Sequence, residues 1–542
     1  MESTNFLDQL ISRSADRTPE RIALSSGEIS LDYAELASSV SAFASGIGQL
    51  GVGRQERIGI YLEKRPETVI ATFGASAAGA VFVPLNPLLK PEQVGYILKD
   101  CNVRLLLTSP ERLALLGGVL PSCHDLRHLV VTGGGEAEND STNPSAHPAL
   151  TTTTWDDLLA APPRPGHRII DTDMAAILYT SGSTGQAKGV VLSQRNMVMG
   201  AKSVASYLGN NAQDTLLAAL PLSFDAGFSQ LTTAFHAGAR AVLLNYLLPR
   251  DVLKAVIREG VTGLTAVPPL WIQLSQLQWP EAVGDHLRYL ANTGGRLPLA
   301  TLTTLREQLP RARVFLMYGL TEAFRSTYLP PAELERRPDS IGKAIPNAEI
   351  LVLREDGTPC AANEPGELVH RGALVGMGYW NDPEKTAERY KPLPGREAGL
   401  VLPEIAVFSG DTVRMDEEGF LYFIGRRDDM IKSSGYRISP TEIEEVCYGS
   451  QLVGEAAAFG VPHEGLGQAV MVVATPKVNT RIDVDADAEA LFAVCRERLP
   501  AYMQPARIDF RPGPLPRNAN GKIDRKSLAK QFETAFTSPR PR

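Results

Sequence analysis

A glycine- and hydroxyl-rich stretch, residues 179–189 (YTSGSTGQAKG), follows the apolar run 174–178. Its glycines allow positive φ angles and a close approach of the backbone to a ligand. Successive N–H groups in such a turn form a concave anion site, and Lys188 adds a point charge suited to phosphate. A mere connector needs neither this lysine nor the apolar strand at 190–192. The stretch therefore predicts a phosphate-binding loop.

A second group of polar residues, at 317–322 (MYGLTE), follows a predicted buried strand. The carboxyl ends of strands are where open α/β folds place ligands. Tyr318 can stack on a base, Thr321 can donate to a phosphate, and Glu322 can hold Mg²⁺ through oxygen. The run 292–298 (NTGGRLP) also follows a strand, and its backbone could press against an adenine ring.

Two later stretches are rich in charge and glycine. Asp411, in FSGD, offers a carboxylate for ribose hydroxyls, and Arg426 opens the charged run 425–438. Lys522 follows a glycine in a late loop, NANGKIDR. A charge run is usually a solvated face, and a lone loop lysine is usually solvated too. Only in combination with the earlier motifs do these residues indicate a site.

The phosphate loop is not of the Walker type, which needs four residues between its glycines and then Lys-Ser/Thr. From about Asp32 to Arg525, the order and spacing of the motifs resemble the adenylate-forming superfamily. That group contains acyl-CoA synthetases, the adenylation domains of nonribosomal peptide synthetases, and luciferases. One departure is visible, because FSGD at 408–411 stands where Tyr-x-Thr-Gly-Asp is commoner. The hydroxyl and the carboxylate are both retained.

The resemblance implies an ATP site. The residues implied to bind the nucleotide are Thr180, Ser181, Gly182, Ser183, Thr184, Gly185, Lys188, Gly294, Gly295, Arg296, Tyr318, Gly319, Thr321, Asp411 and Arg426. The residues implied to be catalytic are Lys522, Glu322, Thr184 and Lys188. Glu322 would hold Mg²⁺, and Lys522 would bridge the substrate carboxylate and the α-phosphate.

The implied reaction has two steps and uses ATP, Mg²⁺ and the thiol of CoA or 4′-phosphopantetheine. The substrate carboxylate attacks the α-phosphorus and releases pyrophosphate, and the thiol then displaces AMP to give a thioester. Asp428 would be the hinge, while Lys432 and Gly435 would border the thiol channel. Because Lys522 and Gly435 serve different steps, we expect the small C-terminal domain to rotate between two poses.

The pair Phe224-Asp225 gives information about the substrate. It resembles the amino-acid-activating branch, in which the Asp pairs with the substrate ammonium. An isolated buried carboxylate is costly, so Asp225 should have a cationic partner. In the alternative, Asp225 caps the next turn or pairs with a protein residue.

The nearest candidate partner for Asp225 within the chain is Arg325. If the substrate ammonium takes Asp225, Arg325 is free to bind a second carboxylate in a bidentate pair. The two residues then predict an amino dicarboxylic acid, such as an aspartate-like one, as in enzymes that load β-amino acids for macrolactam assembly. In the competing picture an Asp225–Arg325 salt bridge closes the pocket around a neutral acyl chain. The predicted pocket comprises Phe224, Asp225, Ser229, Asn292, Met317, Arg325 and Ser326.

Other functions stay open at this point. The main alternative is an acyl-CoA synthetase for a short or medium non-amino acid. A luciferase-like or non-catalytic relative is more remote. The acceptor can be CoA or a free-standing carrier protein.

Composition limits the other partners. The 542 residues predict at least two domains. The net charge of −7 argues against a polyanion-binding role, so we expect no nucleic-acid partner. The five cysteines are odd in number and lack CxxC spacing, which argues against a disulfide framework or a zinc site. With no recognisable signal peptide and no apolar run of about 18 residues, we expect a cytoplasmic protein with no membrane partner.

The elements that must position these residues alternate between helices and strands. A capping-box-like start predicts a helix at 32–50. Segments predicted as strands lie at 57–62, 80–84, 105–108, 129–132, 241–244, 263–266, 289–292 and 313–317. This alternation predicts an α/β fold with mostly parallel sheets. The polar stretch 133–154 predicts a surface loop.

The chain is predicted to contain two domains. Short segments between 342 and 372 predict a small β-barrel section within a large N-terminal domain, residues 1–425. Residues 426–542 would form a small, mobile α+β domain, with the hinge near Asp428. A charged, glycine-flanked joint is typical of such a hinge.

Overall fold

The computed structural model describes residues 4–133, 150–180, 187–394, 402–427, 429–433, 436–463, 465–477, 483–518 and 521–536. The site residues that lie outside these ranges are Ser181, Gly182, Ser183, Thr184, Gly185, Asp428 and Gly435. Within the described part, no helix has the length and apolarity needed to cross a membrane.

The first sheet of the N-terminal domain has the strand order β19-β9-β8-β4-β3-β5-β6-β7. Its strands are β3 (Arg57–Tyr61), β4 (Val81–Pro84), β5 (Val103–Thr108), β6 (His128–Val131), β7 (Thr151–Thr154), β8 (Met174–Thr180), β9 (Lys188–Ser193) and β19 (Gly378–Tyr379). Neighbours from β8 to β7 pair in parallel, while β9 and β19 add an antiparallel edge. Strand β8 ends at Thr180 and β9 begins at Lys188, so the two strands flank the predicted phosphate loop in the sequence.

The second sheet has the order β16-β15-β14-β13-β12-β10-β11-β1-β2. Its strands are β1 (Ile22–Ser26), β2 (Ile29–Asp32), β10 (Thr215–Ala218), β11 (Arg240–Leu243), β12 (Gly263–Ala266), β13 (Tyr289–Asn292), β14 (Arg313–Tyr318), β15 (Thr327–Leu329) and β16 (Lys343–Ala344). The strands from β1 to β14 pair in parallel. Asn292 and Tyr318 end neighbouring strands, so the predicted adenine residues meet at one edge.

Helices pack against both sheets. They are α1 (Gln9–Arg17), α2 (Tyr33–Gln49), α3 (Pro66–Ala78), α4 (Pro91–Asp100), α5 (Pro110–Leu116), α6 (Trp155–Leu159), α7 (Gln194–Leu208), α8 (Asp225–Ala237), α9 (Pro249–Glu259), α10 (Pro268–Ser275) and α11 (Leu299–Gln308). The predicted capping box forms, since Asp32 accepts from the Glu35 N–H and Glu35 accepts from the Asp32 N–H. One core cluster joins α2, α3, α7 and α8 to strands of both sheets.

An antiparallel sheet follows, and it is the half-barrel that corresponds to the predicted β-barrel section. Its strands are β17 (Ala348–Leu353), β18 (Gly366–Gly372), β20 (Tyr390–Pro392), β21 (Ile405–Met415) and β22 (Leu421–Arg426), with α12 (Pro383–Arg389) beside them. Asp411 lies in β21 opposite Arg426 in β22, so the two predicted ribose residues are direct cross-strand neighbours.

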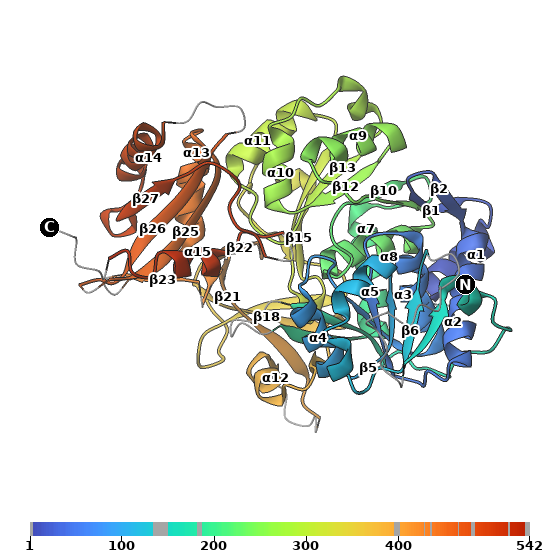
Figure 1. The fold of residues 1–542 in the computed structure, drawn as a ribbon. Coiled ribbons are helices and arrows are strands. Elements are labelled where there is room, and N and C mark those ends of the chain that lie inside the picture. The colour runs from blue at the N-terminus through green and yellow to red at the C-terminus, as the bar shows by residue number, and fades with distance from the viewer. Residues whose placement is uncertain are drawn as a thin grey trace.

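The small C-terminal domain has its own sheet and core, drawn in orange and red beside the rest of the chain in Figure 1. Its elements are β23 (Ile431–Ser433), β24 (Tyr436–Ile438), α13 (Pro440–Gly449), β25 (Val453–His463), β26 (Gly467–Pro476), α14 (Val484–Arg498), β27 (Arg507–Phe510) and α15 (Arg525–Gln531). The α/β fold with a large and a small domain is thus confirmed. The boundary at 425/426 stays a prediction.

The two domains meet where α13 approaches α11 (Figure 1). Helix α11 has Pro298 at its N-cap position and no side-chain cap of its own. Instead, the Leu299 N–H donates to Glu445 Oε1 of α13 at 2.9 Å. Arg296 Nε lies 3.7 Å from the other oxygen of Glu445. A carboxylate of the small domain thus satisfies a backbone donor at a helix start of the large one.

One sequence prediction is wrong. Within the predicted surface loop 133–154, residues 151–154 form β7, which pairs in parallel with β6. These four residues are threonines, which are β-branched and suit strands, but they have no apolar alternation. The strand lies at the sheet edge with exposed and half-buried side chains, so no apolar face is needed.

Candidate active site

The lysine of the phosphate-loop hairpin lies beside an aromatic ring. Lys188 begins β9 opposite Thr180, the last residue of β8. Its Nζ lies 5.3 Å from the centre of the Tyr379 ring, in a cation–π arrangement. Burial, followed by the neighbouring charge of Lys385, lowers the pKa of Lys188. The hairpin thus delivers a partly desolvated cation to the site.

Glu322 lies in a short 3₁₀ turn, Thr321–Ala323, after β14. The Tyr379 hydroxyl donates to Glu322 Oε1 at 2.6 Å, and the Glu322 carbonyl accepts from the Gly376 N–H at 2.8 Å. Among the described residues, no group of three His, Cys, Asp or Glu could hold a metal alone. A single oriented carboxylate fits Mg²⁺, which is usually bound by one or two carboxylates together with substrate phosphates.

The predicted ribose residues form a compact cluster. Tyr318 donates its hydroxyl to Asp411 Oδ2 at 2.5 Å, and Arg426 Nε donates to Asp411 Oδ1 at 3.1 Å. The Asp411 N–H donates to the Ser409 hydroxyl, which itself donates to the Leu368 carbonyl. Burial and the Asp411 charge hold the pKa of Tyr318 well above its usual range. The hydroxyl that the sequence retains at 409 therefore positions the carboxylate.

The predicted adenine loop is held by its own turn. Gly294 has φ +77°, which favours glycine, and the Asn292 amide donates to the Gly295 carbonyl at 2.8 Å. Arg296 instead faces Glu445 of the small domain. At Gly319, a Cβ would lie 3.1 Å from Arg325 Cα, so this glycine lets two backbone segments pass closely.

Lys522 of the C-terminal domain reaches this site. A Cβ on Gly294 would lie 3.3 Å from Lys522 Cε, and the Lys522 amine lies 5.8 Å from the centre of the Phe224 ring. Burial and the charge of Arg426 lower the pKa of Lys522 to about 8, while Asp225 and Asp411 act in the opposite direction. The amine therefore lies within electrostatic range of both the ribose carboxylate and the pocket carboxylate.

Asp225 and Arg325 pair with each other. Arg325 Nη1 lies 3.2 Å from Asp225 Oδ2, and both side chains are 3% exposed. Thr321 adds a long hydrogen bond of 3.4 Å to Asp225 Oδ1. Burial nevertheless raises the pKa of Asp225, and the Arg325 Nε is buried with no hydrogen-bond partner among the described residues. Both charges are thus only partly compensated.

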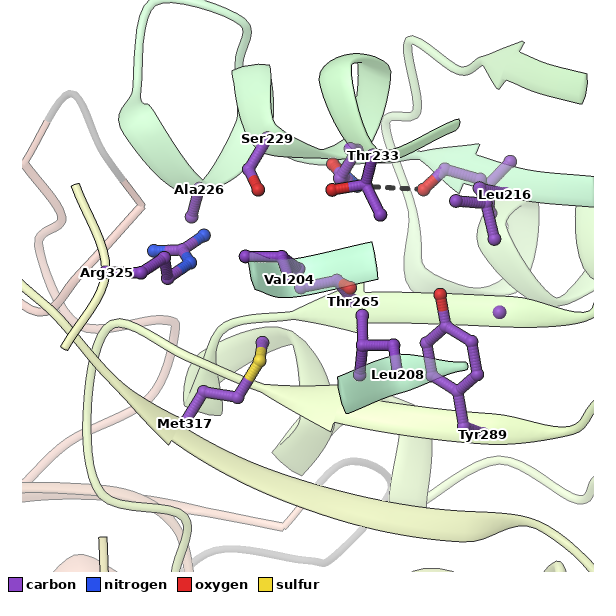
Figure 2. Close-up of a pocket in the computed structure, with 13 residues that line it drawn as sticks. Val204, Leu208, Leu216, Ala226, Ser229, Thr233, Thr265, Tyr289, Met317 and Arg325 are labelled. Atoms are coloured by element: carbon purple, nitrogen blue, oxygen red, sulfur yellow. Dashed lines mark hydrogen bonds between the residues drawn. The ribbon is translucent and has the colours of Figure 1, made fainter. Parts of the chain in front are cut away.

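A small cavity lies beside Arg325 (Figure 2). It offers about 20 Å³ to the centre of a water-sized sphere, which is room for about one water. Of the predicted pocket residues, Ser229, Met317 and Arg325 line it. Phe224, Asp225, Asn292 and Ser326 are absent from its lining; Phe224 faces Lys522 instead.

Three contributors to the site were not predicted. Tyr379 orients Glu322, and Phe324 adopts φ +57° and ψ −51°, a strained conformation for an aromatic residue that costs about 1–3 kcal/mol. The strain coincides with the sharp turn that carries Arg325 towards Asp225. His370 pairs with Ser326 from the half-barrel. None of these three lies in a recognisable sequence motif.

Lys432 stands apart from the others. It lies in β23 with an exposed side chain, and its N–H donates to Gln468. No hydrogen bond or ion pair between Lys432 and the ATP-site residues occurs in the described ranges. The structure thus brings together Lys188, Glu322, Tyr318, Asp411, Arg426, Asp225, Arg325 and Lys522.

His370 yields a prediction on stability. Its Nδ1 lies 2.9 Å from the Ser326 hydroxyl, and burial lowers its pKa from 6.5 to about 4. His370 takes up a proton at a higher pH in the unfolded chain than in the folded one. The free energy of unfolding therefore falls as the pH drops from about 6.5 to 4. This linkage is worth about 3 kcal/mol. Urea unfolding at pH 7 and pH 4.5 measures it. In His370→Gln the acid-dependent loss should shrink by that amount; an unchanged loss contradicts the assignment.

Comparisons with known proteins identify the family and the fold. The family "AMP-binding enzyme" matches residues 11–380, and "AMP-binding enzyme C-terminal domain" matches residues 442–522. The chain is 32% identical over 517 residues to 2-succinylbenzoate–CoA ligase of Geobacillus kaustophilus (strain HTA426), covering 94% of this chain and 95% of that protein.

Much longer proteins match as well. The chain is 29% identical over 546 residues to tyrocidine synthase 3 of Brevibacillus parabrevis, a match that covers 98% of this chain. It spans only 8% of the length of that protein. It spans 10% or less of the linear gramicidin synthase polypeptides of the same organism that it also matches.

Two solved structures share the fold. The anthranilate CoA ligase in complex with anthranoyl-AMP has a TM-score of 0.87 at 24% identity and covers 99% of this chain and all of that one. At that identity the likeness shows the fold alone. The o-succinylbenzoate CoA synthetase from Bacillus subtilis, in complex with ATP and magnesium ion, has a TM-score of 0.78 at 28% identity. That match covers 96% of this chain and 99% of that chain.

Proposed function

The chain belongs to the AMP-binding enzyme family and is an AMP-forming acid–thiol ligase, and from that premise we propose that it activates an amino dicarboxylic acid. The acid would become an acyl-adenylate with release of pyrophosphate, and then a thioester of CoA or of a carrier protein. The observation that carries the adenylation step is Lys522. Its amine lies 5.8 Å from the centre of the Phe224 ring, next to Asp225 in the chain, and the charges of Asp225 and Asp411 both act on its pKa.

The chain's own groups account for the first step. Asp411 would accept from the ribose hydroxyls, with Tyr318 and Arg426 holding it in place. Lys188 and Lys522 would place positive charge at opposite ends of the triphosphate. Mg²⁺, held by Glu322 and the phosphates, would supply further charge stabilisation there. These groups are preorganised, so they stabilise developing charge without reorganisation and need no covalent enzyme intermediate.

The buried ion pair supports this choice of substrate class. Asp225 has a raised pKa although Arg325 lies 3.2 Å away, so a second cation would stabilise its charged form. Arg325 keeps a buried Nε that has no partner among the described residues, which calls for an acceptor. A substrate that carries an ammonium and a second carboxylate supplies both groups. This supports an aspartate-like amino acid.

A second candidate also has an observation in its favour. Asp225 and Arg325 already bond to each other, so the pair could close the pocket around an uncharged acyl chain. The enzyme would then be an acyl-CoA synthetase for a short or medium acid. The small cavity argues against a long alkyl chain in this conformation.

Lys522→Ala should largely abolish adenylate formation and leave thioester formation from supplied acyl-adenylate nearly intact. Loss of one preorganised contact should cost roughly 3–4 kcal/mol, or about 10²–10³-fold. Pyrophosphate exchange and thioester release from supplied adenylate measure the two half-reactions. A matched control is Lys432→Ala, which removes an exposed lysine of the same domain and should retain exchange. Equal losses in both half-reactions of Lys522→Ala would show that the role is misassigned.

The pKa of Lys522 gives a pH dependence. The charged amine is present below about pH 8 and is lost as the pH rises through that value. The kcat/KM of exchange should therefore fall on the alkaline side, since it reports groups of the free enzyme. Lys522→Arg keeps its charge at high pH, so its residual activity should lack this alkaline limb. If the alkaline fall in kcat/KM persists in Lys522→Arg, another group causes it.

Substitutions at Asp225 and Arg325 separate the two substrate classes. Asp225→Asn should lose the preference for amino acids, and Arg325→Gln should lose the preference for a second carboxylate. Each loss in kcat/KM should correspond to roughly 2–5 kcal/mol of transition-state stabilisation, because a substrate charge is left unpaired. Exchange measured over aspartate, β-alanine, succinate and butyrate reads out both preferences.

The control for these variants is Arg337→Gln. Arg337 is also buried, and it pairs with Asp416 and Glu418 outside the site. It should lose stability and keep the substrate preference. If wild type exchanges with butyrate but not with aspartate-like acids, the amino-dicarboxylate proposal fails and the second candidate stands.

A further inference from the structure

The cavity has two chemically different ends (Figure 2). Arg325 lies beside Ala226 at one end, next to the ion pair. Tyr289 lies at the other end, with Leu208 and Leu216 close to it. Because the space between the ends holds about one water, the side chains at the far end set how much of an acid can enter.

The Tyr289 ring is fixed on several sides. Tyr289 in β13 is the register partner of Gly263 in β12. A Cβ at Gly263 would overlap the phenolic end of the Tyr289 ring. The Asn210 amide donates to the Tyr289 hydroxyl at 3.0 Å. Phe315 packs edge-on against the ring at a centroid distance of 5.9 Å. Tyr289 is 1% exposed, so its ring closes this end of the cavity and has little freedom to rotate away.

The space beyond the ring is polar. Asn210 is half-buried, with its Oδ1 unpartnered among the described residues. It donates to Asp214, which pairs with Arg288 at 2.6 Å. The phenol therefore separates the cavity from a polar cluster formed by Asn210, Asp214 and Arg288.

We propose that Tyr289 limits the length of the acid that the pocket accepts, an inference that rests on the proposed adenylating function. The ring occupies the place that an extended chain would need. Gly263 permits this position, since any larger residue there would push the phenol out of it. Tyr289 is then a specificity-determining residue, remote from Lys522 and from the reacting carboxylate.

Two homologous series test the proposal. Unbranched acids from acetate to octanoate and 3-amino acids from β-alanine to 3-aminooctanoate are compared in ATP–pyrophosphate exchange. Tyr289→Leu keeps an apolar side chain and removes the phenolic end. Its longest accepted acid should be longer than in wild type, with a gain in kcat/KM of about four-fold for each methylene that newly fits.

Two matched variants accompany it. Tyr289→Phe keeps the ring and loses only the hydroxyl, so its length profile should match wild type. Gly263→Ala leaves no room for the phenol in its present place, so the ring must move and the length profile should differ from that of wild type. If Tyr289→Leu does not fold, the shift in Gly263→Ala decides the question.

The outcomes separate the two proposals. Identical length profiles for wild type and a folded Tyr289→Leu, with both active, overturn the role of Tyr289 alone. If wild type shows no exchange with any acid of the two series, the second candidate function, a ligase for short or medium acids, fails. The rise in melting temperature on binding the same acids then tests the length limit, because this measurement does not require the enzyme to react. A larger shift with the long acids in Tyr289→Leu than in wild type supports the limit, and equal shifts overturn it.

Discussion

The candidate active site depends on the burial of one amine between two domains. Lys522 belongs to the small domain, yet its side chain lies against Gly294 and Phe224 of the large one. Removing an ammonium from water is costly, and the carboxylates of Asp225 and Asp411 offset only part of that cost, since the pKa of Lys522 is lowered. In this arrangement the candidate site contains a residue from each domain, so it depends on where the small domain lies. The position of a whole domain is thus tied to the charge balance around one side chain.

The sequence predicted the framework because hydrophobic periodicity and strand-end motifs are local signals. The βαβ alternation identified strands such as β12 and β13 to the residue, and the resemblance brought Asp411 and Lys522 into one site. The four threonines of β7 were missed because an edge strand needs no apolar face. Tyr379 and His370 were missed for another reason. Their partners, Glu322 and Ser326, lie 57 and 44 positions away, and no spacing rule connects such distant residues.

The proposed acid-binding end of the site combines backbone strain with incomplete charge pairing. Phe324 holds a left-handed conformation immediately before Arg325, and its ring is fully buried. Such strain persists only where the surrounding packing enforces it. A buried pair that is poorly satisfied contributes little to stability, but it discriminates strongly among ligands, because a wrong ligand leaves a charge unpaired. The sequence suggested both residues. It could not show that they bond to each other while one guanidinium nitrogen stays without a partner among the described residues.

The contact between Glu445 and the first turn of α11 would bias the proposed rotation of the small domain between two poses. The helix lacks a cap of its own, so its N-terminal donor has a charged acceptor only while the small domain is in this position. A lost N-cap costs about 0.5–2 kcal/mol, and about 1.4 kcal/mol corresponds to a tenfold change in an equilibrium constant. This hydrogen bond alone would weight the two orientations by a factor of a few to about thirty. Under that proposal, the start of a surface helix would be a thermodynamic bias on which half-reaction the domain arrangement favours.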